Sequence, residues 1–489
     1  RMRVFLVSSF LLLLASAEVI KKYSDYSLFR KAKKDLPVCI IGAGLAGLSA
    51  ASELEKEGMN YIIIEGAGRV GGRVYPVEYE DGFLQYGATY INGDQNPIYD
   101  IAKANDLIDL NATNAADDYV PIYTENEVIQ GCDVREFSAF TESFVSKYRA
   151  FSKNGLANET FKEAFDSDYN SFLENKNRSS RRSHFDLLAR MFITDMETEW
   201  AALMNKYALF NYEVYNMNAL PAQGTEFTLN KYGFKEILEV IKKGVPDTKI
   251  KLNREVNKID YSSEEKVELT TTKEKFDCSS VIVTVSLGYL KKHSATLFTP
   301  PLPKAKMDAI REIGFGNMQK LFFVYDQPWL EKNAYHTMGP SSSVIFGRGL
   351  TFDVTPWSRK TVQFWFSGPA IEAIGEMSDG KLIYEVTDHL TKTLKNMTVP
   401  RAKKVIRHMW YRDPLVLGSY SYLTPTAVAL KKPNQKLAEP IMGKNGRPLV
   451  QFAGEATHST IYQTTIGAFL SGKREAEKLI QNRRKKANN

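Results

Sequence analysis

The chain of 489 residues has few cysteines and few histidines, three of the first and six of the second. The cysteines, Cys39, Cys132 and Cys278, show neither metal-ligand nor C-x-x-C redox spacing, so we expect no metal site. A disulfide framework is not needed in a chain of this size. Because Cys39 and Cys278 lie in or beside apolar runs typical of strands, we expect them to be small core residues.

A long apolar run is also missing. The apolar stretch from Val4 to Ala15 is shorter than the roughly 20 residues that a membrane-spanning helix needs, so we expect no stable membrane span. Arg1 and Arg3 precede it and small residues follow it as far as Ala17, which is the pattern of a secretory signal peptide. We therefore expect residues 1–17 to be a signal peptide and the protein to be secreted. Four N-x-S/T sequons agree with a glycoprotein, although chance alone would give about as many: Asn111, Asn158, Asn177 and Asn396.

The sequence carries no strong excess of one charge. Its 64 Lys and Arg and 57 Asp and Glu give a net charge of +7, which falls to +5 without Arg1 and Arg3. The densest basic run, residues 483–486, closes the last predicted helix, where positive charge suits the helix dipole, so we expect no nucleic-acid partner. With 43% hydrophobic residues, the chain is expected to be a packed enzyme of two or three structural units.

A β-α-β unit is predicted near the start of the sequence. Residues 37–41 and 60–64 are apolar runs typical of buried strands, and residues 45–57 between them form a predicted helix. The turn from the first strand into the helix reads Gly-Ala-Gly-Leu-Ala-Gly over residues 42–47, which is a G-x-G-x-x-G motif. This motif in this context predicts a dinucleotide-binding site.

Each glycine of the motif has a separate role in such a site. Gly42 makes the tight turn, Gly44 lets the backbone approach a pyrophosphate at the helix N-terminus, and Gly47 lets helix and strand pack closely. Glu65 ends the second strand, 18 residues after Gly47. Its carboxylate is placed to accept hydrogen bonds from a ribose hydroxyl, which disfavours NADP.

The residues that follow this strand distinguish FAD from NAD. Residues 65–73 read EGAGRVGGR and resemble the E-x-x-x-R-x-G-G-R signature of the flavin amine oxidase family, where arginine and glycine backbone meet the FAD diphosphate. Arg73 suits this role because a guanidinium pairs with phosphate oxygens in a fork.

Further segments resemble the same family in the same order along the chain. Residues 87–93, GATYING, resemble an element that lies beside the flavin, and residues 298–302 and 314–320 resemble the F-x-P-P-L-P and G-x-G-x-x-x-K elements. Residues 410–422 and 453–468 look like the polyamine oxidase branch. The resemblance covers more than four hundred residues and implies an FAD-dependent oxidoreductase that acts on amines.

The resemblance also implies which residues hold FAD. Val256 would meet the adenine through its backbone, and Glu455 would touch the ribityl or phosphate region. The residues expected beside the flavin ring are Gly87, Ala88, Thr89 and Thr465. In monoamine oxidases a cysteine near the G-x-Y element carries the flavin covalently. Ser419 holds that place here, so we expect non-covalent FAD.

Lys320 is the expected catalytic residue. In the family a lysine at this place hydrogen-bonds a water beside flavin N5, and desolvation against a cofactor lowers a lysine pKa toward the working range. The implied reaction is hydride transfer from the α-carbon of a primary or secondary amine, which gives an imine that water hydrolyses to an aldehyde. Oxygen then reoxidises the flavin to give hydrogen peroxide, so the expected partners are a small-molecule amine and O2.

Four residues near the flavin elements are candidates for substrate contact: Tyr90, Asn92, Tyr420 and Tyr422. Aromatic side chains suit the walls of such a site, although Tyr420 and Tyr422 could equally be packing residues of a strand. Polyamine oxidases with this motif carry His or Glu at the position of Asn92 and Trp at that of Tyr90, and branch members often carry His at the position of Ile466. These departures predict a less charged substrate or a weakly active enzyme.

The order of predicted elements indicates an α/β fold with a Rossmann-type FAD-binding domain and a second, α+β substrate-binding domain. In the second domain we expect helices over residues 135–152 and 185–210 and a mainly antiparallel sheet that includes residues 321–325 and 362–366. The FAD-binding domain is discontinuous in this prediction and the second domain fills its gaps: residues 36–93, 233–303 and 425–482 for the first, residues 94–232 and 304–424 for the second.

Two other functions stay open. An L-amino acid oxidase has a related fold but needs an arginine for the substrate carboxylate, and none lies between Gly87 and Asp100. A secreted flavoprotein without activity could serve as a binding protein, although retention of Lys320 argues against it. A histone demethylase disagrees with the predicted secretion.

Overall fold

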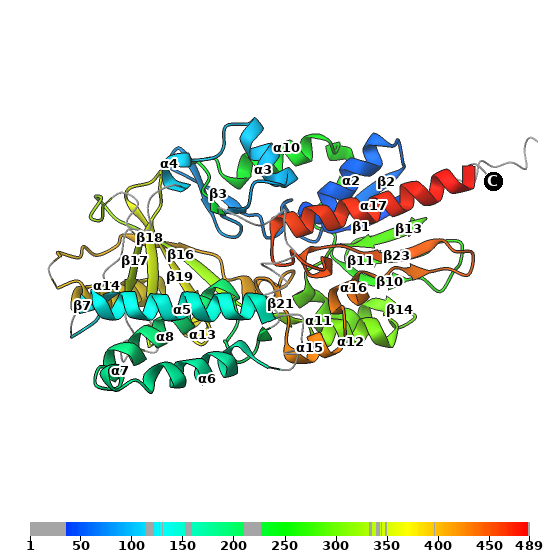
Figure 1. Cartoon of the computed structure of the whole chain (residues 1–489). Helices are drawn as coiled ribbons and strands as arrows, with labels where there is room; N and C mark the ends of the chain where they lie inside the picture. The colour runs from blue at the N-terminus through cyan, green and yellow to red at the C-terminus, as the bar shows by residue number, and fades with distance from the viewer. Residues whose placement is uncertain are drawn as a thin grey trace, which may run out of the picture.

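The computed structural model describes residues 36–113, 122–126, 128–129, 131–151, 159–209, 226–331, 335–338, 343, 345–347, 350–395 and 397–487. The predicted signal peptide, residues 1–17, lies outside them, as do Asn158 and Asn396. The described residues form two halves, each built around a large sheet (Figure 1).

The first half is built on a six-stranded sheet with the order β22-β23-β13-β1-β2-β9. All pairs in it are parallel except β22 with β23. The strands come from three separate stretches of the chain: β1 Val38–Ile41 and β2 Tyr61–Ile64, then β9 Ile250–Lys251 and β13 Ser280–Val283, then β22 Ile441–Met442 and β23 Pro448–Phe452. The predicted α/β fold class is confirmed.

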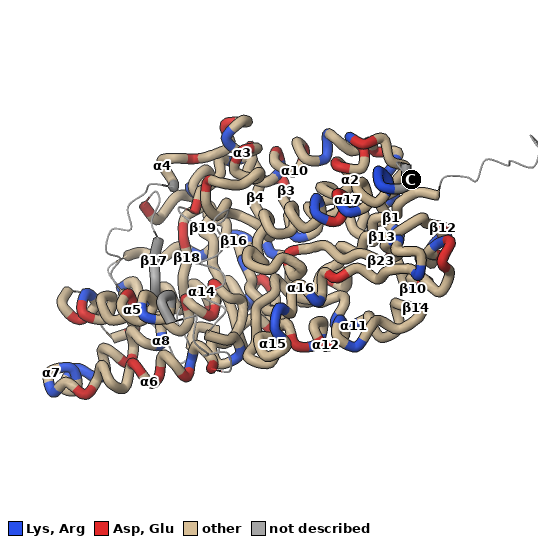
Figure 2. Tube along the Cα trace, turned by 45° about the vertical axis from the view of Figure 1, so that its right-hand side comes forward, with Lys and Arg blue, Asp and Glu red and all other residues tan. Residues whose placement is uncertain are grey.

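Two helices from opposite ends of the sequence pack together on this sheet (Figure 1). Helix α2 spans Leu45–Lys56 and helix α17 spans Thr465–Ala487. The basic run of residues 483–486 is part of α17, and Arg484 forms an exposed ion pair with Glu57 at the end of α2. Figure 2 shows charged residues on these outer helices and none on β1 or β13, as expected of parallel strands buried on both faces.

A smaller sheet beside the first corrects one expectation. It has the order β12-β11-β10-β14, with β10 Val256–Asp260, β11 Val267–Thr271, β12 Lys275–Cys278 and β14 Phe298–Thr299. Cys278 at the end of β12 forms a disulfide with Cys39 in β1, with their Cα atoms 5.7 Å apart. Both are fully buried, as predicted for core residues, but they are also a covalent link between the two sheets. Cys132 is a free, exposed thiol.

The second half is built on a seven-stranded sheet with the order β20-β16-β19-β18-β17-β6-β7. The predicted antiparallel pairing is confirmed, because β16 pairs antiparallel with β19 and β20, and β18 with β17 and β19. The strands are β6 Ile122–Tyr123, β7 Val128–Ile129, β16 Met318–Val324, β17 Tyr335–Met338, β18 Leu350–Val354, β19 Thr361–Ser367 and β20 Lys404–Arg407.

The two faces of this second sheet differ in chemistry because side chains alternate along each strand. One face carries Leu321, Phe323 and Phe364, which pack with helices α13 Ala370–Glu376 and α14 Asp379–Thr393. The opposite face carries residues such as Lys320, Gln363 and Trp365 in the alternate positions. The sheet therefore has a hydrophobic side and a polar side.

Three helices of the second half share a core rich in phenylalanine and tyrosine. They are α5 Cys132–Phe151, α6 Phe161–Leu173 and α8 Arg182–Glu199. The prediction that the last helix runs to residue 210 was wrong. After Glu199 the chain turns back at Ala201, whose φ is +52°, and the buried carboxylate of Glu197 accepts a hydrogen bond from the N–H of Met204 at 3.0 Å.

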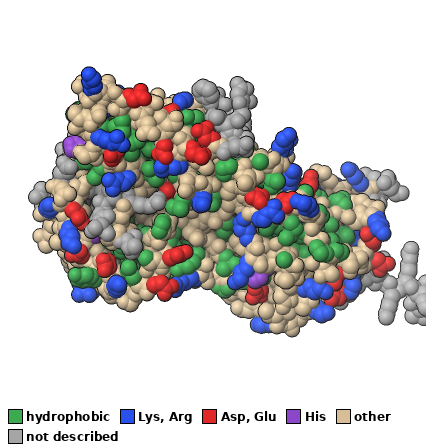
Figure 3. All heavy atoms as spheres, turned by 90° about the horizontal axis from the view of Figure 1, so that it is seen from below, with side chains coloured by type: hydrophobic (Ala, Val, Ile, Leu, Met, Phe, Trp, Pro, Cys, Tyr) green, Lys and Arg blue, Asp and Glu red, His purple; other side chains and the backbone are tan. Residues whose placement is uncertain are grey.

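The remaining elements connect or flank these layers: β3 Pro76–Tyr79, β4 Gly82–Gln85, β5 Ile91–Asn92, α3 Pro97–Ala104, α4 Leu110–Thr113, α7 Lys176–Ser179, β8 Glu226–Phe227, α10 Phe234–Lys243, α11 Leu287–Leu297, α12 Lys304–Glu312, β15 Gly314–Phe315, β21 Ser421–Tyr422, α15 Pro425–Ala429 and α16 Pro433–Ala438. Among the described residues, no helix combines the length and the apolar character that crossing a membrane requires. On the face drawn in Figure 3, basic and acidic side chains are intermixed.

Candidate active site

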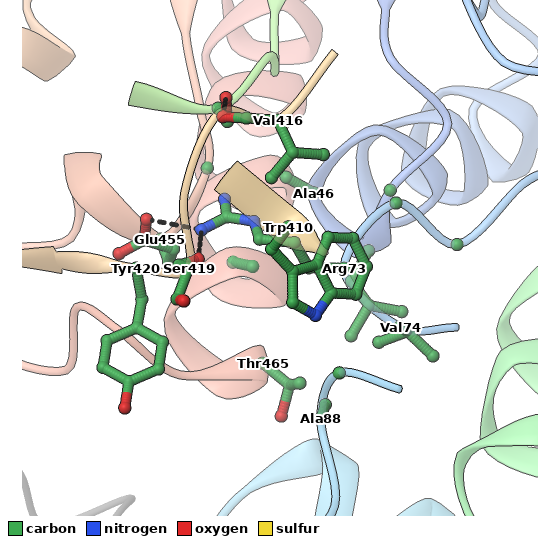
Figure 4. A pocket seen from close by; sticks show the side chains of 18 of the residues that line it. Ala46, Arg73, Val74, Ala88, Trp410, Val416, Ser419, Tyr420, Glu455 and Thr465 are labelled. Atoms are coloured by element: carbon green, nitrogen blue, oxygen red, sulfur yellow. Dashed lines mark hydrogen bonds and ion pairs between the residues drawn. The ribbon is translucent and has the colours of Figure 1, made fainter. Parts of the chain in front are cut away.

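One cavity of about 760 Å³ runs between the two halves and collects most of the predicted site residues. It begins at the glycine turn after β1, passes the loop of residues 65–73, and ends against α8 and the polar face of the second sheet. Figure 4 shows the middle of this cavity, where side chains from distant parts of the sequence converge.

The glycine turn forms a cradle that side chains would fill. Gly42 has a φ of +107°, and a Cβ on Gly47 would lie 1.9 Å from the carbonyl oxygen of Gly42. Gly44 lines the cavity and bridges to Gly71, so the motif and the loop after β2 approach one another directly. Gly47 does not line the cavity but lets α2 pack on β1, as the motif predicts. The cradle fits a dinucleotide phosphate.

Glu65 is held at the cavity wall by backbone groups on either side. Its carboxylate accepts hydrogen bonds from the N–H of Ala43 at 2.6 Å and of Ala67 at 2.7 Å. Burial raises the pKa of Glu65, and these two hydrogen bonds oppose the shift. A carboxylate has about four lone-pair positions, so both oxygens still have capacity for the hydroxyl groups of a ribose.

Arg73 and Glu455 meet in the middle of the cavity (Figure 4). The Nη1 atom of Arg73 donates to the Oε1 atom of Glu455 at 2.9 Å and to the carbonyl oxygen of Ser419 at 2.8 Å. The other oxygen of Glu455 accepts from the hydroxyl of Ser421 at 2.6 Å and from the N–H of Gln463 at 2.9 Å. Arg73 is thereby aimed into the cavity with its charge balanced, which suits a residue that contacts a diphosphate.

The other predicted cofactor residues lie along the same cavity: Gly87, Ala88, Thr89, Val256 and Thr465. Thr465 begins α17. The carbonyl oxygen of Val256 already accepts a hydrogen bond from the hydroxyl of Tyr289 at 3.2 Å. Sequence reasoning missed Gln463, which also lines the cavity and whose buried Nε2 atom has no hydrogen-bond partner among the described residues. A buried donor of this kind suits an acceptor on a bound ligand.

Lys320 lies directly behind the wall of the cavity. It belongs to β16, its side chain is 1% exposed, and its Nζ atom donates to the carbonyl oxygen of Gly87 at 3.0 Å and to the hydroxyl of Thr89. Burial lowers the pKa of Lys320 to about 7, and the negative charge of Asp353 opposes this shift. The predicted catalytic lysine is therefore enclosed by protein and lies next to the predicted flavin element. Its pKa is close to neutral pH.

Two of the predicted aromatic residues line the cavity, together with one that was not predicted. Tyr90 stacks on Trp365, with ring centroids 6.2 Å apart. Tyr420 lines the cavity, and its hydroxyl donates to the carbonyl oxygen of Glu199 at 3.0 Å, at the end of α8. Tyr422 is absent from the cavity lining and packs against Gly314, in the strand that pairs with its own. Of the two readings given to Tyr422, the structure supports packing.

Three carboxylates that the motifs do not single out reach the same cavity. Asp195 and Glu199 lie one turn apart on α8, and Glu226 lies on β8. Asn92 donates from its Nδ2 atom to Glu226 at 2.6 Å, because β5 and β8 pair at these two residues. Burial raises the pKa of Asp195 to about 6 and that of Glu199 to about 7. Asp195 and Glu199 remain accessible from the cavity although protein surrounds them.

The structure changes the interpretation of the two positions, Asn92 and Ile466, from which the charge of the substrate was predicted. Asn92 is neutral but anchors a carboxylate, and Ile466 is fully buried in the core. The prediction of a less charged substrate or a weakly active enzyme rested on those two positions alone. The cavity instead takes its acidic groups from α8 and β8, which lie far from the motifs in the sequence.

Residues 45–480 match the family of flavin containing amine oxidoreductases. The chain belongs to this family. It is an amine oxidoreductase, and its cofactor is FAD. When bound, FAD would supply a hydride acceptor for the carbon next to an amine nitrogen, and the glycine cradle, Arg73 and the Gly87 segment would hold it.

Curated relatives match almost the whole chain at low identity. Probable polyamine oxidase 5 of Arabidopsis thaliana is 28% identical and covers 92% of this chain and 98% of its own length. Peroxisomal N(1)-acetyl-spermine/spermidine oxidase of Bos taurus is 27% identical, with 91% and 94% covered. Lysine-specific histone demethylase 2 of Homo sapiens is 26% identical over 95% of this chain and 56% of its own length.

The surroundings of Ser419 lead to a prediction about how FAD is held. Ser419 lines the cavity, but its hydroxyl donates to the carbonyl oxygen of Met318 at 2.9 Å and accepts from the Met318 N–H at 2.7 Å. No thiol is available at this position for a flavin linkage. We expect acid precipitation of the holoprotein to release all flavin into the supernatant. Yellow colour that remains with the pellet would contradict non-covalent binding.

Proposed function

We propose that the enzyme oxidises a polyamine at a carbon next to a primary or secondary amine, to an imine that water hydrolyses to an aldehyde. In the same proposal FAD, when bound, would supply the acceptor for the two electrons, and O2 would be the final acceptor and give hydrogen peroxide. The observation that carries the proposal is the acidic end of the cavity, which is lined by Asp195, Glu199 and Glu226. Trp365 lines the same cavity. Three carboxylates suit a ligand with several positive nitrogens.

The chain's own groups divide the work in this proposal. The carboxylates bind the distal ammonium groups, and Tyr90 and Trp365 form an apolar wall for the methylene chain. Lys320 binds and releases a proton beside Gly87 and Thr89, because a lysine with a pKa near 7 exchanges protons at neutral pH. The names of the relatives that act on acetylated spermine and spermidine support the same substrate class.

The test of the proposal is anaerobic mixing of the holoprotein with four compounds while the flavin absorbance is followed. Spermine and N-acetylspermine are expected to bleach the flavin, tyramine to do so more slowly, and leucine to have no effect. Bleaching by leucine alone would favour an L-amino acid oxidase. Bleaching by none would favour a flavoprotein without activity.

Specific loss of charge at Glu199 is expected to weaken polyamine binding. For Glu199→Gln, we expect KM for spermine to rise roughly tenfold or more, because a desolvated charge pair loses one partner, and KM for tyramine to change much less. In the parent enzyme, Asp195 and Glu199 ionise as the pH rises through about 6 and 7. KM for spermine should therefore fall between pH 6 and 8. Steady-state peroxide production measures both effects.

A matched control for this variant is Glu142→Gln, which removes an exposed carboxylate of α5. It is expected to leave both KM values unchanged. An equal rise of KM for spermine and tyramine in Glu199→Gln would show that the carboxylate does not distinguish substrates by their number of positive charges.

The competing amino acid oxidase needs a free arginine at the substrate end of the cavity. Among the described residues, the arginines that line the cavity are Arg69, Arg73 and Arg254, and all three lie at its cofactor end. Arg69 donates to the carbonyl oxygen of Gly72, Arg73 pairs with Glu455, and Arg254 pairs with Glu274. This arrangement gives the amine oxidase proposal its advantage over recognition of a carboxylate.

We also propose that the protein folds in an oxidising, secretory compartment. The buried disulfide between Cys39 and Cys278 supports this, because disulfides persist in such compartments. Two sequons within the described residues, Asn111 and Asn177, are exposed and accessible to glycosylation. Expression of the full chain in secreting cells, with detection only in the cell lysate, would contradict the proposal.

A further inference from the structure

Lys320 and Trp365 belong to one cross-strand row on the polar face of the second sheet. Lys320 on β16 pairs with Trp365 on β19, which pairs with Thr351 on β18. The next row on the same face consists of Phe322, Gln363 and Asp353, each two residues along its strand. Asp353 is the acidic group of that second row, and no motif in the sequence points to it.

Asp353 is tied to the first row through the indole of Trp365. Its Oδ1 atom accepts a hydrogen bond from the indole Nε1 of Trp365 at 2.8 Å and from the Nε2 of Gln363 at 3.2 Å. The Nζ atom of Lys320 lies 5.0 Å from the centre of the Trp365 ring system. Asp353 is half-buried and does not line the cavity itself.

We propose that Asp353 is a positioning residue for amine oxidation, which fixes Trp365 through its indole N–H and holds a negative charge behind Lys320. The proposal rests on the proposed function for its effect on the rate, but its electrostatic part does not depend on any substrate. Trp365 contacts Tyr90 at the cavity wall, so an error in the orientation of the indole would move both the substrate wall and the cation that packs against it.

The second part of the inference concerns the charge of Asp353, and its effect on the pKa of Lys320 has a definite direction. Burial lowers the pKa of Lys320, and the negative charge of Asp353 opposes that shift. Burial raises the pKa of Asp353, and the hydrogen bonds from Trp365 and Gln363 and the positive charge of Lys320 oppose this shift. Among the described residues that line this end of the cavity, the other ionisable groups include Asp195 and Glu199 on α8, Glu226 on β8, and the phenol groups of Tyr90 and Tyr420. Loss of the charge at Asp353 therefore favours the neutral amine of Lys320.

Two substitutions at one position separate the anchor from the charge. Asp353→Ala removes both, and we expect it to slow anaerobic flavin reduction by spermine about tenfold, the size of one hydrogen bond to a charged group. Asp353→Asn keeps an acceptor for the indole and removes the charge. It is expected to restore most of the rate. Trp365→Phe is expected to slow reduction by a similar factor, and the double variant Asp353→Ala/Trp365→Phe to be no slower than the worse single variant.

The effect of the Asp353 charge on Lys320 is measured without substrate, by a pH titration of the bound-flavin absorbance in the resting holoprotein. The parent is expected to show a midpoint near pH 7, the pKa of Lys320. In Asp353→Asn the midpoint is expected to move down by about half a unit or more, because the opposite charge is gone. Glu372→Gln, an exposed carboxylate on α13, is the matched control and should leave the midpoint in place.

The outcomes distinguish this inference from the proposed function. A lowered midpoint in Asp353→Asn, with no oxidation of any amine by the parent, would support the electrostatic part of the inference and reject both the function and the positioning role. An unmoved midpoint together with additive rate losses in the double variant would overturn the inference and leave the function intact. A lower melting temperature in Asp353→Ala with unchanged rate and unchanged midpoint would assign Asp353 a purely structural role.

Discussion

Replacement of Lys320 by methionine is expected to slow anaerobic flavin reduction by an amine roughly 100-fold or more, while FAD stays bound. The reason is that Lys320 is the buried lysine beside Gly87 and Thr89 to which the proposed function gives the proton exchange. Positioned acid–base groups contribute about 10²–10⁴-fold to rates. The methionine side chain fills a similar volume, so the glycine cradle and Arg73 should keep the cofactor. Stopped-flow absorbance measures the rate, and the ratio of flavin to protein absorbance measures FAD content.

A second buried lysine provides the control for this experiment. Lys306 is 3% exposed, and burial lowers its pKa to about 7, as for Lys320. Its Nζ atom donates to three carbonyl oxygens at the end of α16, those of Lys436, Leu437 and Glu439, outside the cavity. Lys306→Met is expected to lower the melting temperature but not the rate per bound flavin. Full activity in Lys320→Met would remove Lys320 from the mechanism.

Loss of the disulfide is expected to lower the free energy of unfolding by about 2–5 kcal/mol. The variant is Cys278→Ser, which releases a link between residues 239 positions apart. The reason is that the unfolded chain gains freedom when so long a loop is opened, and the hydroxyl of serine is buried without an assured partner. Denaturant unfolding of the non-reduced holoprotein, followed by tyrosine and flavin fluorescence, measures the change.

The free cysteine serves as the comparison for that variant. Cys132→Ser changes an exposed thiol and is expected to leave unfolding unchanged. Thiol titration of the denatured, non-reduced parent should find one reactive thiol. Three reactive thiols would show that Cys39 and Cys278 are not bonded, and would also remove the main support for an oxidising compartment.

The cofactor half of the site follows closely from local sequence. The glycine motif, Glu65 and Arg73 lie within one β-α-β unit and its following loop, so their spacing along the chain fixes their spacing in space. Lys320 was found because a motif marks it, and its place within β16 rather than before a strand changes little. Local patterns also predict the antiparallel pairing of the second sheet, since alternation of apolar residues marks strands on its hydrophobic side.

The substrate half depends on contacts between distant elements, which one sequence does not reveal. Asp195 and Glu199 resemble the solvent face of an ordinary amphipathic helix until α8 is placed against the cavity. Glu226 enters through its strand pairing with Asn92. The disulfide was missed for the same reason, because apolar context alone does not tell a core thiol from a bonded one. The residue type at a motif position predicts the side chain at that position. It does not predict the side chains that neighbouring elements place beside it.

The order of strands in the first sheet has a consequence for biosynthesis. Strand β23 lies between β22 and β13, yet it is made from residues 448–452, more than 400 residues after β1. At typical rates of translation, roughly 20–80 s separate the two strands. The glycine turn is thus made long before Glu455 and α17, which close the site. We therefore expect FAD to load only after these later segments are made, and a premature stop before residue 448 should yield a protein that never acquires colour.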